Sequence, residues 1–215
     1  MNNVITQIRD IFRPVLSDRT IVKYYKKGLL IETPISQNQL QPNSVDLTLG
    51  RSFKKILAND VKLDLYDTGK YQRVRDRQDF INPSLPMRYE SGESDSFHLE
   101  PGGFILLASN EVLNIPNGIL SFVQGRSSIA RIGVQTEQAG LIDAGFRGTI
   151  TFEIYNETKY PVVLYPGMRV AQVYFFKSQY ARKIYGKEKN SKYAGQIEAT
   201  GSMIHNDPEL KDVQR

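Results

Sequence analysis

The chain contains no cysteine and only two histidines, His98 and His205. Without cysteine the fold has no disulfide bonds and does not depend on the redox state of its compartment. Zinc-dependent base deaminases hold their metal with one histidine and two cysteines or with three cysteines, so the composition excludes that zinc cofactor. Neither histidine stands in a motif with a candidate nucleophile, which disfavours Ser–His and Cys–His catalysis. We interpret both histidines as surface residues.

Long apolar runs are also missing, and none approaches the roughly 20 residues that a membrane-spanning helix needs. The N-terminal stretch MNNVITQIRD lacks the charged and then apolar segments of a secretory signal peptide. We therefore expect a soluble, cytoplasmic protein without a membrane partner.

Basic residues outnumber acidic ones, but they are dispersed along the chain. The formal net charge of +5 suggests an anionic ligand. Because the basic residues form no long cluster, a small phosphorylated ligand suits them as well as a polymer does. We expect no nucleic acid polymer as partner.

The length of 215 residues and the 40% hydrophobic content suit one domain with a normal core. Apolar residues recur at helical spacing in 2–12, and a second helix is expected at 19–27, before Gly28. We predict one domain over 1–177, with its N-terminal helices in 1–28, and a weakly periodic tail over 178–215.

From residue 29 onward the spacing of turn-forming residues is typical of β structure. Proline, glycine and asparagine separate short apolar or alternating runs, which predicts a barrel or a sandwich. Residues 65–95 are polar and are expected to form a long surface excursion. The clearest strand candidates are 45–49, 104–107, 119–123 and 169–176.

Residues 125–128, Gly-Arg-Ser-Ser, follow a predicted strand and open a predicted helical turn. Two hydroxyls, a guanidinium and free backbone N–H groups in one place are typical of a phosphate site. The alternative is that Ser127 or Ser128 only caps a short helix and Arg126 lies in solvent.

Residues 138–156 predict a strand, a glycine-bounded turn and a second strand. If the hairpin is centred near Gly145, the segment around Gln138 lies across from Glu153. The small residues Ala139 and Gly140 leave backbone open to a flat ligand such as a base. Strand alternation favours a solvent-facing Glu153, whereas an inward carboxylate beside a base would be a candidate proton shuttle.

Several segments carry a family resemblance through their order and spacing. They are LSDRTI and KGLLI near the start, QPNSVDLTLG at 41–50, PGGFILLAS, GRSSIARIGV, AGLIDAGFRGTITFEIYN, YPGMRVAQV, and SKYAGQ in the tail. Together they resemble the dCTP deaminase family of the dUTPase superfamily, and most closely its bifunctional, dUMP-forming members.

The resemblance implies a mainly β fold, a distorted β-barrel or jelly roll of the dUTPase-like type, with short N-terminal helices and a flexible C-terminal tail. It also implies a homotrimer with active sites shared between subunits, and Mg²⁺ carried on the nucleotide triphosphate. Asp46 matches a position that lies near the water shell of the metal in the dUTPase branch, and a structural role in its strand is the alternative.

The resemblance gives Glu153 the role of the general base, which activates water for attack at cytosine C4 and passes the proton to the departing ammonia. Arg131 would support this water and Glu153. Gln138 and Ala139 would contact the base and help to hold the water, although many deaminases have threonine at the position of Gln138.

The resemblance also implies a set of residues for the triphosphate. Phosphates would be held by Arg126, Ser127 and Ser128, which one subunit supplies to the site of its neighbour. The tail would close over the triphosphate through Tyr185, Lys192 and Gln196.

Gly140 and Leu141 stand where one-step deaminases of the proteobacterial type have His-Arg. This pair resembles both dUTPases and the bifunctional deaminases, and Gly140 is counted with the nucleotide-binding residues. In the bifunctional enzymes the residue matching Asp143 contacts the deoxyribose 3′-hydroxyl and helps to activate a water that attacks the triphosphate.

These residues are compatible with three functions. The first is deamination of dCTP, coupled to triphosphate hydrolysis that gives dUMP and pyrophosphate and supplies dUMP for thymidylate synthesis, or stopping at dUTP. The second is a dUTPase, which Glu153 disfavours because dUTPases generally have an apolar residue there. The third is a nucleotide-sensing protein without enzymatic activity.

Overall fold

The computed structural model describes residues 14–56, 62–63, 80–81, 89–137, 140–188 and 191–206. The helix expected at 2–12, most of the polar stretch at 65–95, Gln138 and Ala139 lie outside these residues. Within the described ranges, no helix is long and apolar enough to span a bilayer.

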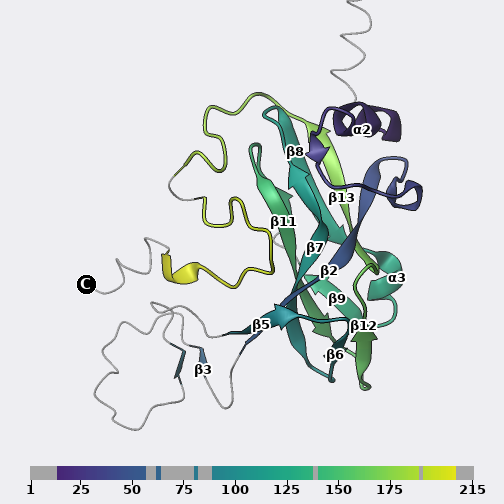
Figure 1. Cartoon of the computed structure of the whole chain (residues 1–215), viewed down its shortest axis with the longest axis vertical. Helices are drawn as coiled ribbons and strands as arrows, with labels where there is room; N and C mark the ends of the chain where they lie inside the picture. Colours follow the sequence, from purple (N-terminus) through teal and green to yellow (C-terminus); the bar gives the residue numbers. More distant parts are fainter. Residues whose placement is uncertain are drawn as a thin grey trace, which may run out of the picture.

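One antiparallel sheet of nine strands forms the body of the described chain, so the mainly β class is confirmed (Figure 1). The strand order is β10-β8-β13-β2-β7-β11-β9, with β1 paired to β7 and β5 paired to β2. The bounds are β1 Leu30–Ile31, β2 Ser44–Ile56, β5 Tyr89–Glu93, β7 Phe104–Asn114, β8 Ile119–Gly125, β9 Val134–Glu137, β10 Leu141–Ile142, β11 Arg147–Asn156 and β13 Arg169–Lys177. Two small sheets pair β6 Phe97–Leu99 with β12 Val162–Leu164, and β3 Lys62–Leu63 with β4 Phe80–Ile81.

The long strand β2 joins the two halves of the large sheet. Its first residues pair with β13 and its later residues with β7, with a register shift in each ladder. Such irregularities bend a strand and increase its twist, so the sheet curls around its own apolar face. Val45, Leu47 and Leu49 of β2 are fully buried at alternating positions on that face.

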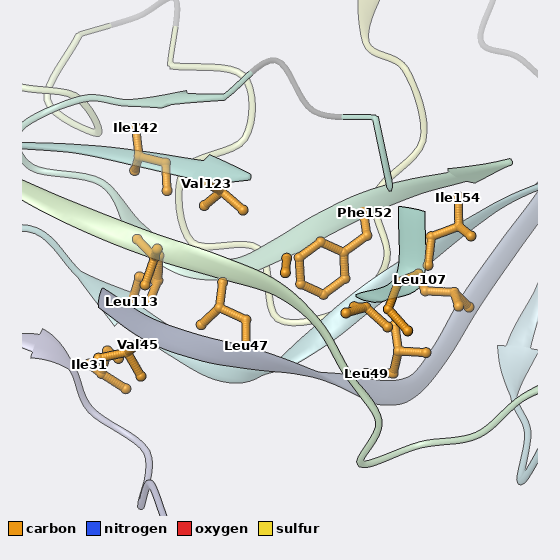
Figure 2. Close-up of a cluster of buried hydrophobic side chains, with 14 of the residues drawn as sticks. Ile31, Val45, Leu47, Leu49, Leu107, Leu113, Val123, Ile142, Phe152 and Ile154 are labelled. Atoms are coloured by element: carbon orange, nitrogen blue, oxygen red, sulfur yellow. The ribbon is translucent and has the colours of Figure 1, made fainter. Parts of the chain in front are cut away.

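The core lies inside this curl. Leu107 of β7 and Phe152 and Ile154 of β11 are 0% exposed, and they pack with Val123 of β8 and the apolar residues of β2 (Figure 2). Around Phe152 and Ile154 of β11, the alternation of apolar and other residues therefore identifies the core-facing positions correctly.

The described helices are short and lie at the edges of the sheet. They are α2 Asp18–Tyr25, α3 Ser127–Ala130 and the 3-10 turns η1 Gln37–Gln39 and η2 Ile204–Asn206. The helix predicted at 19–27 is confirmed as α2. It buries Ile21 against the core, and the chain leaves the helical conformation at Gly28, where φ is +68°.

The hairpin predicted around Gly145 is wrong. Leu141 and Ile142 pair with β8, whereas the chain from Arg147 onward pairs with β7. The turn between them is a corner between the halves of the sheet. A hydrogen bond from the backbone N–H of Gly145 to the Ile115 carbonyl (2.8 Å) fixes this corner. The strand opposite Glu153 is β9, and its register pairs Glu153 with Glu137, one residue before Gln138.

The described part of the tail, 178–188 and 191–206, runs back along β11 (Figure 1). Residues 153–156 of β11 pair with β9, but Thr149 lies beyond that ladder. The tail bonds to this open edge: Thr149 N–H donates to the Gln196 carbonyl (2.9 Å), and Gln196 Nε2 donates to the Thr149 carbonyl (2.7 Å). The last strand in the described part of the chain, β13, ends at Lys177, just before the predicted tail begins.

Candidate active site

A cavity of about 510 Å³ lies between the outer face of β11, the β10–β11 corner and the tail. We call it the main cavity. Five residues proposed from the sequence line it: Gly140, Asp143, Glu153, Tyr185 and Gln196. Its other walls are largely apolar and include Leu106, Val123, Phe146 and Ile150. A mostly apolar pocket with a few polar groups is typical of a small-molecule site.

Glu153 lies half-buried on the wall of this cavity. Its neighbours Phe152 and Ile154 face the core, so Glu153 faces the opposite side of β11. Alternation places it correctly on the side away from the core. Because the tail covers this side, the carboxylate lines a cavity and does not face open solvent.

Asp143 and Gly140 reach the cavity from the two ends of β10. The Asp143 carbonyl accepts a hydrogen bond from Phe146 N–H (3.1 Å), which closes the corner. Gly145 has φ of +95°, and a Cβ there would lie 2.6 Å from the Tyr185 carbonyl oxygen. The absence of a side chain at this corner therefore lets the tail approach.

The tail contributes one side of the cavity. Tyr185 N–H donates to the Ala144 carbonyl (3.0 Å), and the Tyr185 ring packs on Phe146 with centroids 5.9 Å apart. The Tyr185 hydroxyl accepts a bond from Tyr193 N–H (3.1 Å). Lys192, also proposed from the sequence, is not among the residues that line the main cavity, and its Nζ lies 6.0 Å from the centre of the Tyr193 ring.

Sequence reasoning missed a second part of this wall. Thr200, Gly201 and Ser202 line the cavity together with Tyr89 and Tyr193. Ser202 N–H donates to the Tyr89 hydroxyl (2.8 Å), and Thr200 N–H donates to Thr151 Oγ1 (3.0 Å). No periodic pattern marks these residues, because the tail is irregular and Tyr89 lies within the stretch interpreted as a surface excursion.

The residues proposed for phosphate binding lie elsewhere in the chain. Arg126, Ser127 and Ser128 line a hollow of about 340 Å³ with Asp46 and Gln172, which we call the Arg126 hollow. Arg126 and Ser127 also border a neighbouring hollow of about 460 Å³. Neither hollow includes Glu153 or Asp143, so one chain does not bring the two sets of residues into one cavity.

The alternative reading of residues 126–128 as a simple helix cap is wrong. Helix α3 begins at Ser127, with Arg126 at the N-cap position and no side-chain capping bond. The Arg126 side chain is only 26% exposed, and its Nε lies 3.4 Å from Asp46 Oδ2. Arg126 is therefore held against the sheet.

Arg131 is exposed at the C-terminal end of α3, and it does not line the main cavity in this chain. Asp46 is buried in β2, and its Oδ2 lies 3.0 Å from Arg169 Nη1. Among the described residues, no three histidine, aspartate or glutamate side chains converge as a metal site. Asp46 is in contact with two guanidinium groups, those of Arg126 and Arg169.

His98 is exposed, in agreement with its interpretation as a surface residue, whereas the side chain of His205 lies outside the described part of the structure.

Comparisons with known proteins agree with this architecture. A family model described as dCTP deaminase-like matches residues 15–178. A "dCTP deaminase, dUMP-forming" from Sulfurihydrogenibium sp. is 38% identical over 190 residues, covering 88% of this chain and 97% of that protein. One of the same name from Dictyoglomus thermophilum is 39% identical over 197 residues, covering 90% and 96%. A solved structure, the 2′-deoxycytidine 5′-triphosphate deaminase from Agrobacterium tumefaciens, matches with a TM-score of 0.57 at 22% identity, over 77% of this chain and 48% of that chain, and supports the fold.

Proposed function

This chain belongs to the dCTP deaminase-like family, and from that premise we propose that it converts dCTP to dUMP. Water replaces the amino group at cytosine C4 and ammonia leaves, which gives dUTP. A second water then cleaves the triphosphate, which gives dUMP and pyrophosphate. The observation that carries the proposal is that Glu153 and Asp143 line the same cavity. The relatives described above share the name of this overall reaction.

Glu153 is the proposed general base of the first step. Its carboxylate takes a proton from the attacking water as the oxygen bonds to C4, and then gives this proton to the amino nitrogen as the C–N bond breaks. The apolar walls around Glu153 suit a flat pyrimidine ring. Arg131, Gln138 and Ala139 remain predicted contributors to the water site.

Asp143 is the proposed base of the second step, and it also binds the sugar. It lines the cavity at the β10–β11 corner. Gly140, where the pyrimidine ring is expected, lies at the other end of β10. Mg²⁺ enters with the triphosphate as part of the substrate, and it neutralises phosphate charge during the displacement. A place for Asp46 near the water shell of that ion stays a prediction from the family resemblance.

We propose that the active unit is a homotrimer with shared sites. The outward face of β10, β8 and β13 carries a row of apolar side chains, with Phe122 39% and Leu141 51% exposed. Leu141 pairs with Phe122 across the strands, and the Phe122 ring packs edge-on against Phe176. A contiguous exposed apolar face is typical of a protein interface. Leu141 also lines the main cavity, so a neighbour docked here lies beside the site.

The separation of the phosphate-binding residues from the main cavity supports the same arrangement. Gln124 follows Phe122 on the same face of β8, and Gln172 precedes Tyr174 on the same face of β13. Both glutamines line hollows beside Arg126. The face that begins at the main cavity thus continues, with polar glutamines, toward Arg126. A head-to-tail contact that repeats around a threefold axis brings unlike surfaces together, so it can join the cavity of one copy to the Arg126 hollow of the next.

The assay that tests this function compares two substrates. Purified protein with Mg²⁺ is incubated separately with dCTP and dUTP, and ammonia, dUTP, dUMP and pyrophosphate are quantified. We expect ammonia and pyrophosphate in equal yield from dCTP. Accumulated dUTP would mean a deaminase that stops there, and pyrophosphate from dUTP without ammonia from dCTP would mean a dUTPase. Nucleotide binding without any product would mean a sensing protein. We place the activity in the cytoplasm, where it supplies dUMP for thymidylate synthesis.

A further inference from the structure

Asp46 is a buried carboxylate between two arginines. Its side chain is only 2% exposed, and its Oδ2 lies 3.0 Å from Arg169 Nη1 and 3.4 Å from Arg126 Nε. Gln41 Nε2 lies 3.4 Å from the same oxygen. The register places Asp46 opposite Gln172 of β13, so the group lies on the floor of the Arg126 hollow.

The two arginines are held differently. Arg169 Nη1 donates to Asp46 and also to the Asn38 carbonyl (2.8 Å), so its position is fixed from two sides. Arg126 has the longer contact with Asp46, and its Nη1 donates to the Arg169 carbonyl (3.2 Å). Arg169 is therefore the main counter-charge of Asp46, and the Arg126 guanidinium is oriented while it borders the hollow.

A second buried carboxylate fixes the strand that carries Asp46. Glu111 of β7 is 3% exposed and accepts bonds from Thr48 N–H (2.8 Å), the Thr48 hydroxyl (2.7 Å) and Gln39 Nε2 (2.7 Å). Gln39 Nε2 also donates to the Asp46 carbonyl (3.0 Å). These bonds hold β2 at the place where its ladder with β13 shifts register.

We propose that Asp46 is a positioning residue for phosphate binding, which holds the Arg126 guanidinium toward the triphosphate while Arg169 neutralises the buried carboxylate. This inference rests on the proposed function, since it deepens the phosphate role of Arg126. With one carboxylate and two guanidiniums, the group keeps one net positive charge for the ligand. A fixed guanidinium loses less conformational freedom on binding, so it binds phosphate more tightly than a mobile one.

Positioning by Asp46 and the charge of Asp46 have opposite effects on the affinity for triphosphate. Asp46→Asn removes a negative charge beside the phosphates, so electrostatics alone would tighten triphosphate binding. Loss of positioning would weaken it instead. We expect Asp46→Asn to bind Mg²⁺–dCTP and inorganic tripolyphosphate about tenfold more weakly, because an oriented charge-assisted hydrogen bond is lost.

Isothermal titration calorimetry with Mg²⁺–dCTP and with tripolyphosphate measures this effect without turnover. Asp95→Asn is the matched control, because Asp95 forms an exposed ion pair with Arg51 and borders neither hollow. It should bind as the wild type does. Equal or tighter binding by Asp46→Asn would overturn the proposal.

Arg169→Met gives a second test on a partly exposed residue, in case Asp46→Asn does not fold. Without Arg169, Asp46 draws Arg126 toward itself, so tripolyphosphate binding should weaken in the wild-type background and change little in an Arg126→Met background. An equal loss in both backgrounds would contradict positioning through Arg126. A wild type that binds tripolyphosphate but releases no ammonia from dCTP would refute the proposed function, while the binding comparison still decides the role of Asp46.

Discussion

Glu153 faces the cavity because its two chain neighbours face the core. Phe152 and Ile154 are fully buried, and the pleat of β11 turns the residue between them to the other side. Polar side chains on a strand usually reach water on that side, but here Tyr185, Gln196 and residues 200–202 of the tail line the same space. A carboxylate in such a position has both a fixed direction and restricted access to solvent.

Replacement of Glu153 tests the base directly. Glu153→Gln keeps the size of the side chain but cannot accept the proton of the attacking water. We expect at least a 100-fold loss of ammonia release from dCTP, the order that general base catalysis contributes. Nucleotide binding, measured by calorimetry, should persist. Undiminished ammonia release would remove Glu153 from the mechanism.

Asp143 belongs to the second chemical step in the proposal, so its loss should separate the two products. Asp143→Asn is expected to release ammonia from dCTP but to form pyrophosphate about 100-fold more slowly, because the base for the second water is lost. Quantification of dUTP and dUMP by chromatography checks this, and dUTP should accumulate. Ammonia release by the same variant is the internal control. Pyrophosphate formation at the wild-type rate would contradict the assignment.

At the scale of elements, the tail and the edge of β11 depend on one another. The tail supplies both a donor and an acceptor to Thr149, at a part of the strand that β9 does not reach. Backbone groups at such an edge need partners, and these bonds bring Gln196 to the cavity. The tail therefore shapes the site although its described residues, 178–188 and 191–206, form no regular strand.

Gly201 tests whether the docked tail matters for the substrate. A Cβ at this position would lie 2.6 Å from Cζ of Tyr89, so Gly201→Ala should displace residues 200–202 from the cavity wall. We expect the KM for dCTP to rise about tenfold, because the loss of well-packed contacts of this kind costs about 1–2 kcal/mol. Steady-state kinetics measures it, with thermal melting to show that the sheet remains folded.

Gly92→Ala is the control for this variant, because it lies on the same strand as Tyr89 and its Cβ would meet the Phe53 ring at an ordinary distance of 3.5 Å. Its KM should stay at the wild-type value. If Gly201→Ala also kept the wild-type KM, residues 200–202 of the tail would have no part in substrate binding.

At the scale of the whole molecule, the question is how the main cavity and the Arg126 hollow combine. A triphosphate bound with its base at Glu153 needs cationic partners that the described walls of the main cavity do not supply. The outward face of β10, β8 and β13, apolar at Leu141 and Phe122 and polar at Gln124 and Gln172, runs between the two places and is the surface that another copy would cover. The proposed shared site follows from these two features together.

Mixed oligomers test this sharing. Glu153→Gln and Arg126→Met should each be nearly inactive alone, because every site lacks one essential residue. In randomly mixed oligomers, a site that takes Glu153 from one copy and Arg126 from its neighbour is intact in about a quarter of cases. We therefore expect co-expression of the two variants to restore about a quarter of the wild-type ammonia release. No recovery from confirmed mixed oligomers would mean that both residues act from the same chain.

The sequence by itself determined the residue types, the core-facing positions around Glu153 and the family. Alternation identified Phe152 and Ile154 as core, and the motifs around Arg126, Asp143 and Glu153 carried the resemblance that the family match confirms. These features are local, since they depend on spacing along one strand or on the order of short motifs.

The tertiary structure decided which strands pair and what covers each face. The segment around Gly145 became a corner because Ile142 and Arg147 pair with different strands, which no local pattern specifies. The face of Glu153 became a cavity wall because a tail more than thirty residues away in sequence bonds to the edge of β11. The contacts of Asp46 with Arg126 and Arg169 likewise join three separate strands or strand ends. Strand pairing and the packing of a segment on a sheet face depend on groups that are distant along the chain. The periodicity of a strand therefore indicates which of its faces is apolar or polar, but not what lies against that face.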